Sequence, residues 1–139
     1  MAGVERRQRA GRRGMSGDPL FARIQENFAR QAFMATLGAT LTRVAPGEVE
    51  IAVPSRHALT QQNGFLHAGV TASIADSACG YAALSVMPEG RDVLSVEFKV
   101  NLLAPAAGTG AVARAQVIRA GRSITVCRAT VFAVDVDGA

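Results

Sequence analysis

The stretch HAGVTASIADSACGYAALS, residues 67–85, decides the fold of this 139-residue chain. After His67 nearly every residue is small or apolar, and Asp76 is the only acidic or basic side chain among them. Small, unbranched apolar residues favour a helix. The lack of a polar stripe predicts a helix that is buried on most sides. The breaker cluster MPEG, residues 87–90, ends it.

The residues before this helix predict a second helix and a hairpin. Asp18 and Pro19 are suited to begin a helix, which we expect to run to Gly38. Apolar side chains recur along it near the helical period: Leu20, Ile24, Phe28 and Phe33. Segment 39–53 then alternates polar and apolar residues around the turn APG, residues 45–47, which predicts two antiparallel strands.

The residues after the long helix predict three more strands. Segment 93–103, VLSVEFKVNLL, alternates strictly, with one apolar face made of Leu94, Val96, Phe98, Val100 and Leu102. Segments 110–120 and 123–134 are separated by a short turn, which indicates an antiparallel meander.

This order of elements predicts an α+β fold, with an antiparallel sheet of five to six strands wrapped around one long central helix. We expect a single domain over residues 18–139 and a disordered, Arg-rich leader over residues 1–17. A two-layer unit of this kind leaves a sheet edge and a face open, which favours a homodimer or homotetramer.

The net charge of +4 lies in the leader, because residues 1–14 hold five Arg and one Glu. The other residues hold 10 basic and 10 acidic groups (15 − 5 and 11 − 1), so the body is neutral. We therefore expect no nucleic-acid partner. A carboxylate in the middle of the long apolar segment argues against a membrane span, and no secretory signal is evident. We expect a cytoplasmic protein with reduced Cys79 and Cys127 and no metal.

Three strings together resemble the hotdog-fold acyl-CoA thioesterases of the phenylacetic-acid-degradation (PaaI-like) type: QNGFLHAGVTASIADSACG (62–80), SVEFKVNLLAPAAG (95–108) and AGRSITVCRATVF (120–132). The resemblance covers about residues 20–136. Gly64, His67 and Asp76 match the family's usual string, whereas Ala68 stands where the family has the first Gly of His-Gly-Gly.

The resemblance implies hydrolysis of an acyl- or aryl-CoA thioester to a free acid and CoA, so coenzyme A is part of substrate and product and no cofactor is needed. In that family the carboxylate at Asp76 activates water or attacks the thioester directly. A buried structural carboxylate held by hydrogen bonds is the alternative role for it.

The other implied catalytic residues are Gln61, His67, Ala68, Gly69 and Ser95. The backbone N–H of Ala68 would bind the thioester oxygen, with Gly69 allowing close approach. Gln61 and His67 would lie near the thioester, and Ser95 would place the water or the carboxylate. The simpler alternatives are a surface amide, a helix cap and a solvated strand serine. In this family the site forms between subunits.

For substrate binding, the resemblance implicates Asn63, Gly64, Arg122 and Ser123. Asn63 and Gly64 more simply make a turn. Arg122 could bind a CoA phosphate, and the alternatives for this role are Arg91, Arg119 and Arg128. The acyl tunnel has candidate residues that could equally be plain core: Phe65, Leu66, Val70, Ile74 and Met87. A non-catalytic acyl-CoA sensor and a hotdog enoyl-CoA hydratase are the rival functions. The hydratase usually has His five residues after the Asp, where this chain has Tyr81.

Overall fold

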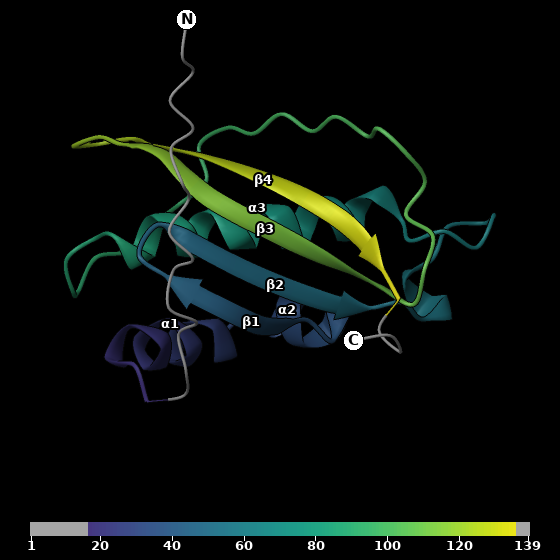
Figure 1. Cartoon of the computed structure of the whole chain (residues 1–139), viewed down its shortest axis with the longest axis horizontal. Helices are drawn as coiled ribbons and strands as arrows, with labels where there is room; N and C mark the ends of the chain where they lie inside the picture. Colours follow the sequence, from purple (N-terminus) through teal and green to yellow (C-terminus); the bar gives the residue numbers. More distant parts are fainter. Residues whose placement is uncertain (1–16, 136–139) are drawn as a thin grey trace, which may run out of the picture.

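The computed structural model describes residues 17–135 of the chain. The predicted leader therefore lies outside the described residues, except for Gly17. The elements are α1 (Pro19–Ala29), α2 (Ala32–Leu37), β1 (Thr40–Ala45), β2 (Glu48–Pro54), the 3-10 turn η1 (His57–Leu59), α3 (Ala68–Ser85), β3 (Gly110–Ala120) and β4 (Thr125–Val134). The strands form one antiparallel sheet in the order β1-β2-β3-β4. Figure 1 shows α3 lying along one face of this sheet, as the α+β prediction requires.

The core lies between α3 and the sheet. Ile74 and Ala78 of α3 are fully buried, and they face the inward side chains of the central strands. On β2 these are Val49, Ile51 and Val53, and on β3 they are Ala111, Ala113 and Ala115. Alternation along both strands follows from the two-residue period of extended chains. The short alanine side chains on β3 let the helix lie close to the sheet.

The helix predicted from Asp18 to Gly38 is two helices. Its start is as expected, because the Asp18 side chain accepts a hydrogen bond from the Leu20 N–H at 2.9 Å. The chain then becomes extended at Gln31, between α1 and α2. In a continuous helix, buried Phe28 and Met34 would point roughly 120° apart. The break re-aims the second helix, so that both residues are buried.

The prediction of a strand over 93–103 is wrong for this chain, and over residues 17–135 the sheet has four strands rather than five to six. The segment carries no strand hydrogen bonding, and Figure 1 shows it as a trace outside the sheet, past β4. Its apolar row (Leu94, Val96, Phe98, Val100 and Leu102) is exposed. Within residues 17–135 nothing covers that row, so the alternating pattern finds no second layer to pack on.

The α3 helix is also less enclosed than its composition suggests. The face that points away from the sheet carries an exposed Gly69 and half-exposed Ser73, Asp76 and Gly80. These residues recur every three or four positions and therefore share one side of the helix. The single carboxylate of the helix lies in this open row, and not in the core.

Candidate active site

Asp76 and Ser95 form the centre of the candidate site. The Ser95 hydroxyl donates a hydrogen bond to Oδ1 of Asp76 at 2.6 Å, although the two residues are 19 positions apart. Asp76 is half-exposed, and its Oδ2 has no hydrogen-bond partner among residues 17–135. A carboxylate with one oxygen held and the other free can accept a proton from water.

His67 occupies the N-cap of α3. Its Nδ1 accepts the backbone N–H of Gly69 at 2.8 Å, so the ring proton of the neutral imidazole must lie on Nε2. A Cβ at Gly69 would come within 3.0 Å of this Nδ1. A side chain at position 69 would therefore crowd the cap. The capping role expected as the simpler alternative for His67 is observed.

The backbone N–H of Ala68, one residue before Gly69, has no hydrogen-bond acceptor among residues 17–135. The N–H groups of Val70 and Thr71 both donate to the carbonyl of His67, at 2.9 and 3.4 Å, and the cap uses that of Gly69. Within the described residues nothing accepts the Ala68 N–H. A free N–H in the first helical turn lies at the positive end of the helix dipole. It can bind an oxygen that becomes negative.

A tight turn before α3 holds Gln61. The Gln61 N–H donates to the Phe65 carbonyl at 2.9 Å, and the Gly64 N–H donates to the Gln61 carbonyl at 3.0 Å. Gly64 has a φ of 85°, a left-handed conformation that favours glycine. The Asn63 N–H donates to Oε1 of Gln61. Asn63 and Gly64 thus build the turn, and the amide NH₂ of Gln61 is left without a partner within residues 17–135.

The structure does not bring all the predicted residues to one point in a single chain. Ala68 and Asp76 are eight residues apart on one straight helix, which separates them by roughly 12 Å. Reacting groups must lie about 3–3.5 Å from the atoms that they contact. One thioester carbon cannot touch both groups of the same α3. Gln61 and His67 lie beyond the Ala68 end, farther still from Asp76.

Arg122 and Ser123 lie in the exposed turn between β3 and β4. Figure 1 shows that this turn is at the same end of the molecule as the C-terminus of α3, opposite the end where α3 begins. Within one chain these two residues are therefore remote from Gln61 and His67. Arg128, an alternative contact for CoA phosphates, lies on β4 and points away from α3.

A pocket of about 310 Å³ adjoins the N-terminus of α3. It is lined by Phe33 and Leu37 of α2, by residues 58–60, and by His67, Gly69, Val70 and Ser73. Phe33, expected on the apolar stripe of the first helix, is instead 58% exposed. Among the tunnel candidates, Val70 lines this pocket, whereas Leu66 and Ile74 belong to the core. The helical spacing of Phe33 in the sequence does not predict this position, because the break between α1 and α2 turns the residue outward.

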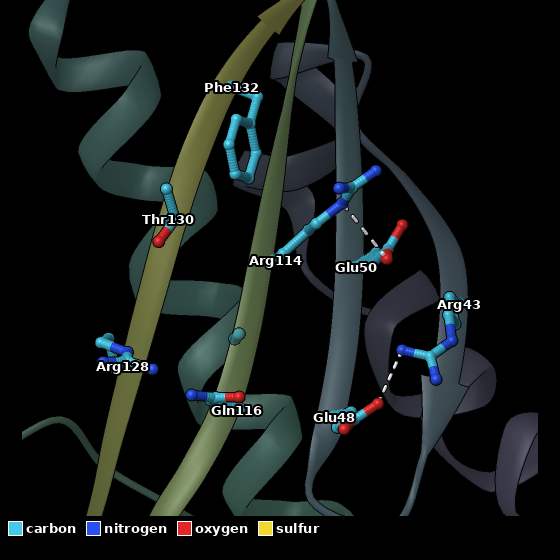
Figure 2. A pocket seen from close by; sticks show the side chains of 9 residues that line it. Arg43, Glu48, Glu50, Arg114, Gln116, Arg128, Thr130 and Phe132 are labelled. Carbon is cyan, nitrogen blue, oxygen red and sulfur yellow. Dashed lines mark ion pairs between the residues drawn. The ribbon is translucent and has the colours of Figure 1, made fainter. Parts of the chain in front are cut away.

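A second pocket, of about 260 Å³, lies on the sheet face opposite α3 (Figure 2). Arg43 pairs with Glu48 at 2.7 Å, and Arg114 pairs with Glu50 at 3.4 Å. The Arg114 guanidinium also lies 5.2 Å from the centre of the Phe132 ring. This surface holds none of the predicted catalytic residues, and most of its charges are paired with one another.

The two cysteines are free thiols. Burial, with smaller contributions from Cys127 and Asp76, raises the pKa of Cys79 to about 12, and burial also raises the pKa of Cys127. Both thiols therefore stay protonated at neutral pH and are poor nucleophiles.

Between residues 17 and 135 there is no group of three or more potential ligands that could hold a metal ion. No helix in that range is long and apolar enough to span a membrane.

The comparisons with known proteins identify the family and the fold of the chain. The family model of the thioesterase superfamily matches residues 63–138. A thioesterase family protein from Silicibacter pomeroyi has a TM-score of 0.82 and 51% identity, covering 86% of this chain and 88% of that one. A thioesterase from Haemophilus influenzae has a TM-score of 0.70 and 26% identity, covering 76% and 73%. The E. coli PaaI protein from the phenylacetic acid degradation operon shares the fold, with a TM-score of 0.68 and 20% identity over 83% and 93%.

Proposed function

We propose, from the premise that this chain belongs to the thioesterase superfamily and is a thioester hydrolase, that its substrates are acyl-CoA or aryl-CoA esters in the cytoplasm. The observation that carries the assignment of the reacting group is the hydrogen bond from Ser95 to Asp76. It holds the only acidic side chain of α3 on the open face of the helix. A carboxylate with a free Oδ2 in such a place suits attack on a thioester, either through water or directly.

In the water route, Oδ2 of Asp76 takes a proton from a water molecule, whose oxygen then attacks the thioester carbon. The carbonyl oxygen becomes negative and is stabilised by the free Ala68 N–H and the helix dipole. Collapse of this intermediate breaks the carbon–sulfur bond. CoA leaves as its thiolate, which takes up the proton held by Asp76, and the acid is released. In the direct route, Oδ2 itself bonds to the carbon, CoA leaves, and water then hydrolyses the anhydride.

The separation of Ala68 and Asp76 supports a site shared between two copies of the chain. If two α3 helices lay antiparallel with Asp76 of one beside Ala68 of the other, their crossing point would fall midway, at Ala72. Ala72 and Ser73 are small and half-exposed, so the two helices could approach closely there. The same contact would generate two identical sites, each with Asp76 from one copy and Gln61, His67 and Ala68 from the other.

This arrangement also supports a place for the CoA moiety. The turn with Arg122 and Ser123 lies at the C-terminal end of its own α3. Antiparallel helices would move it toward the N-terminal end of the second α3, near Gln61 and His67. Arg122 would then offer a fork of donors to a CoA phosphate. Contact between the exposed apolar rows of segment 93–103 would complete the homodimer, and a homotetramer would need a further contact.

The environment of Tyr81 weighs against the hydratase alternative. Tyr81 is buried, and its hydroxyl donates to Oδ1 of Asn27 at 3.2 Å. Burial is also the main cause that raises its pKa. A side chain held in this way cannot take the role of the histidine that a hydratase has at that position. A sensor without activity is the remaining alternative, and activity measurements decide it.

The deciding experiment is thiol release from a panel of aryl- and alkyl-CoA esters by wild type, Asp76→Asn and Asp92→Asn. Asp92 is exposed in the loop after α3, so its variant is a matched control for the same chemical change. We expect Asp76→Asn to lose at least about a hundredfold in kcat and Asp92→Asn to keep the wild-type rate. Wild type that binds CoA esters without hydrolysing any of them would support the sensor instead.

A further inference from the structure

The pocket beside the N-terminus of α3 has mainly apolar walls. Leu37, Leu59 and Val70 form its base and are at most 8% exposed. Phe33 of the short helix α2 also lines the pocket and is largely exposed. Among residues 17–135, no Lys, Arg, Asp or Glu lines it. A charged or strongly hydrated group would lose its water there without a compensating partner, whereas an apolar group would gain from burial.

One side-chain hydrogen-bond donor of the pocket is available to a ligand. The Thr60 hydroxyl donates to the His57 carbonyl at 2.8 Å, and that of Ser73 donates to the Gly69 carbonyl at 2.6 Å. His67 differs, because its Nδ1 is occupied by the cap and its Nε2–H has no acceptor within residues 17–135. The pocket therefore combines apolar walls with one fixed N–H donor at its side.

The free Ala68 N–H, the candidate donor to the thioester oxygen, lies between His67 and Gly69, two residues that line the pocket. A thioester whose oxygen met this donor would have its two arms near the mouth of the pocket. Only the acyl arm suits the uncharged apolar walls, because the CoA arm carries phosphates. A volume of about 310 Å³ lies at the lower end of the range for small-molecule pockets, about 300–1,000 Å³, which suits an acyl group of medium size.

From this geometry we infer that the pocket between α2, η1 and α3 binds the acyl group, and that Phe33 limits the length of acyl chain accepted. The inference rests on the proposed function and adds to it a substrate class, uncharged apolar acyl groups of medium size. Phe33 acts as a specificity-determining residue. It contacts neither Asp76 nor the reacting carbon, so it should alter the choice of substrate more than the chemistry.

The test is a series of straight-chain acyl-CoA esters from two to sixteen carbons, with benzoyl- and phenylacetyl-CoA, measured as kcat/KM. Phe33→Ala enlarges the pocket, and Ala58→Leu narrows it from an exposed position. Phe132→Ala is the matched control, since it removes a 44% exposed ring from the opposite face of the sheet. The oligomeric state of each variant is measured by analytical ultracentrifugation.

We expect wild type to lose about tenfold in kcat/KM with each one or two methylenes beyond its preferred length. Phe33→Ala should move the preferred length up by two or more carbons, and Ala58→Leu should move it down, while Phe132→Ala leaves it unchanged. An unchanged length profile in Phe33→Ala would overturn the inference. So would a change in oligomeric state without a change in profile, because Phe33 would then belong to a contact between copies. If wild type hydrolyses no ester, the proposed function itself fails, which is a separate result.

Discussion

The Ser95 hydroxyl lies 2.6 Å from Oδ1 of Asp76 and connects the segment after α3 to the centre of that helix. Ser95 is the polar residue of segment 93–103 that faces the helix, while the apolar row of that segment faces away. The alternating pattern therefore turns Ser95 toward the candidate site. This orientation gives Ser95 a specific partner and leaves Leu94, at 92% exposure, without one.

Replacing Ser95 with Ala should lower kcat about tenfold and change KM less than twofold. The hydroxyl fixes one oxygen of the carboxylate and so aims the other, which affects the reacting geometry more than substrate binding. Ser95→Thr keeps a hydroxyl and should recover most of the rate. Steady-state kinetics on the best ester of the panel measures this. Equal rates in wild type and Ser95→Ala would mean that Ser95 is only a surface serine.

The sequence predicts the elements around α3 well, because each one is determined locally. The cap at Asp18, the hairpin around Gly47 and the turn at Gly121 all follow from residue types with strong conformational preferences. The strand predicted over 93–103 fails for a different reason. Segment 93–103 has the pattern of a strand, but a strand also needs a hydrogen-bonding partner, and the pattern cannot say whether that partner belongs to the same chain.

The residues of the candidate site also divide into those whose roles are determined locally and those whose contacts depend on the tertiary structure. The turn role of Gly64 and the capping role of His67 are local and could be anticipated. The contact between Ser95 and Asp76 required the tertiary structure, and so did the pocket under Phe33. A helical spacing read along 19–38 places Phe33 in the core, and only the break at Gln31 turns it outward. The separation of Asp76 from Ala68, in contrast, follows from the helical rise once α3 is accepted.

Adding a methyl group at position 69 should reduce stability and activity more than removing the methyl group of Ala68. In Gly69→Ala the new Cβ would lie 3.0 Å from Nδ1 of His67, so the ring must shift by a few tenths of an ångström and the cap is weakened. We expect the free energy of unfolding to fall by about 1 kcal/mol. We expect activity to fall by a larger fraction than stability does. Urea titration and kinetics measure the two effects. Ala68→Gly adds no atoms and keeps the N–H, so it should retain most of the activity, and the opposite ranking would contradict the cap geometry.

Native Cys79 should resist alkylation by iodoacetamide at pH 8. Because its pKa is raised to about 12, about one thiol in ten thousand is ionised at that pH, against about one in ten at the ordinary value of 9.0. The thiolate is the reactive form, so reaction should be about a thousandfold slower than in urea-unfolded protein. The rate should rise as the pH is raised toward 12. Mass spectrometry of the labelled Cys79 peptide from the wild-type protein gives the rate. Equal rates in folded and unfolded protein would show that Cys79 is not protected.

The exposed apolar row of segment 93–103 should mediate the association of two copies. A charge introduced at Val96, as in Val96→Asp, would have to be desolvated in such a contact, at a cost of several kcal/mol. The same charge costs little in a single chain, because Val96 is already 83% exposed. We therefore expect this variant to sediment as a folded monomer and to lose activity, since one chain cannot combine Asp76 with the Ala68 of a second. Thr130→Asp, an exposed change on the outer sheet face, should remain dimeric and active. A monomeric Val96→Asp variant with full activity would mean that one chain contains a complete site.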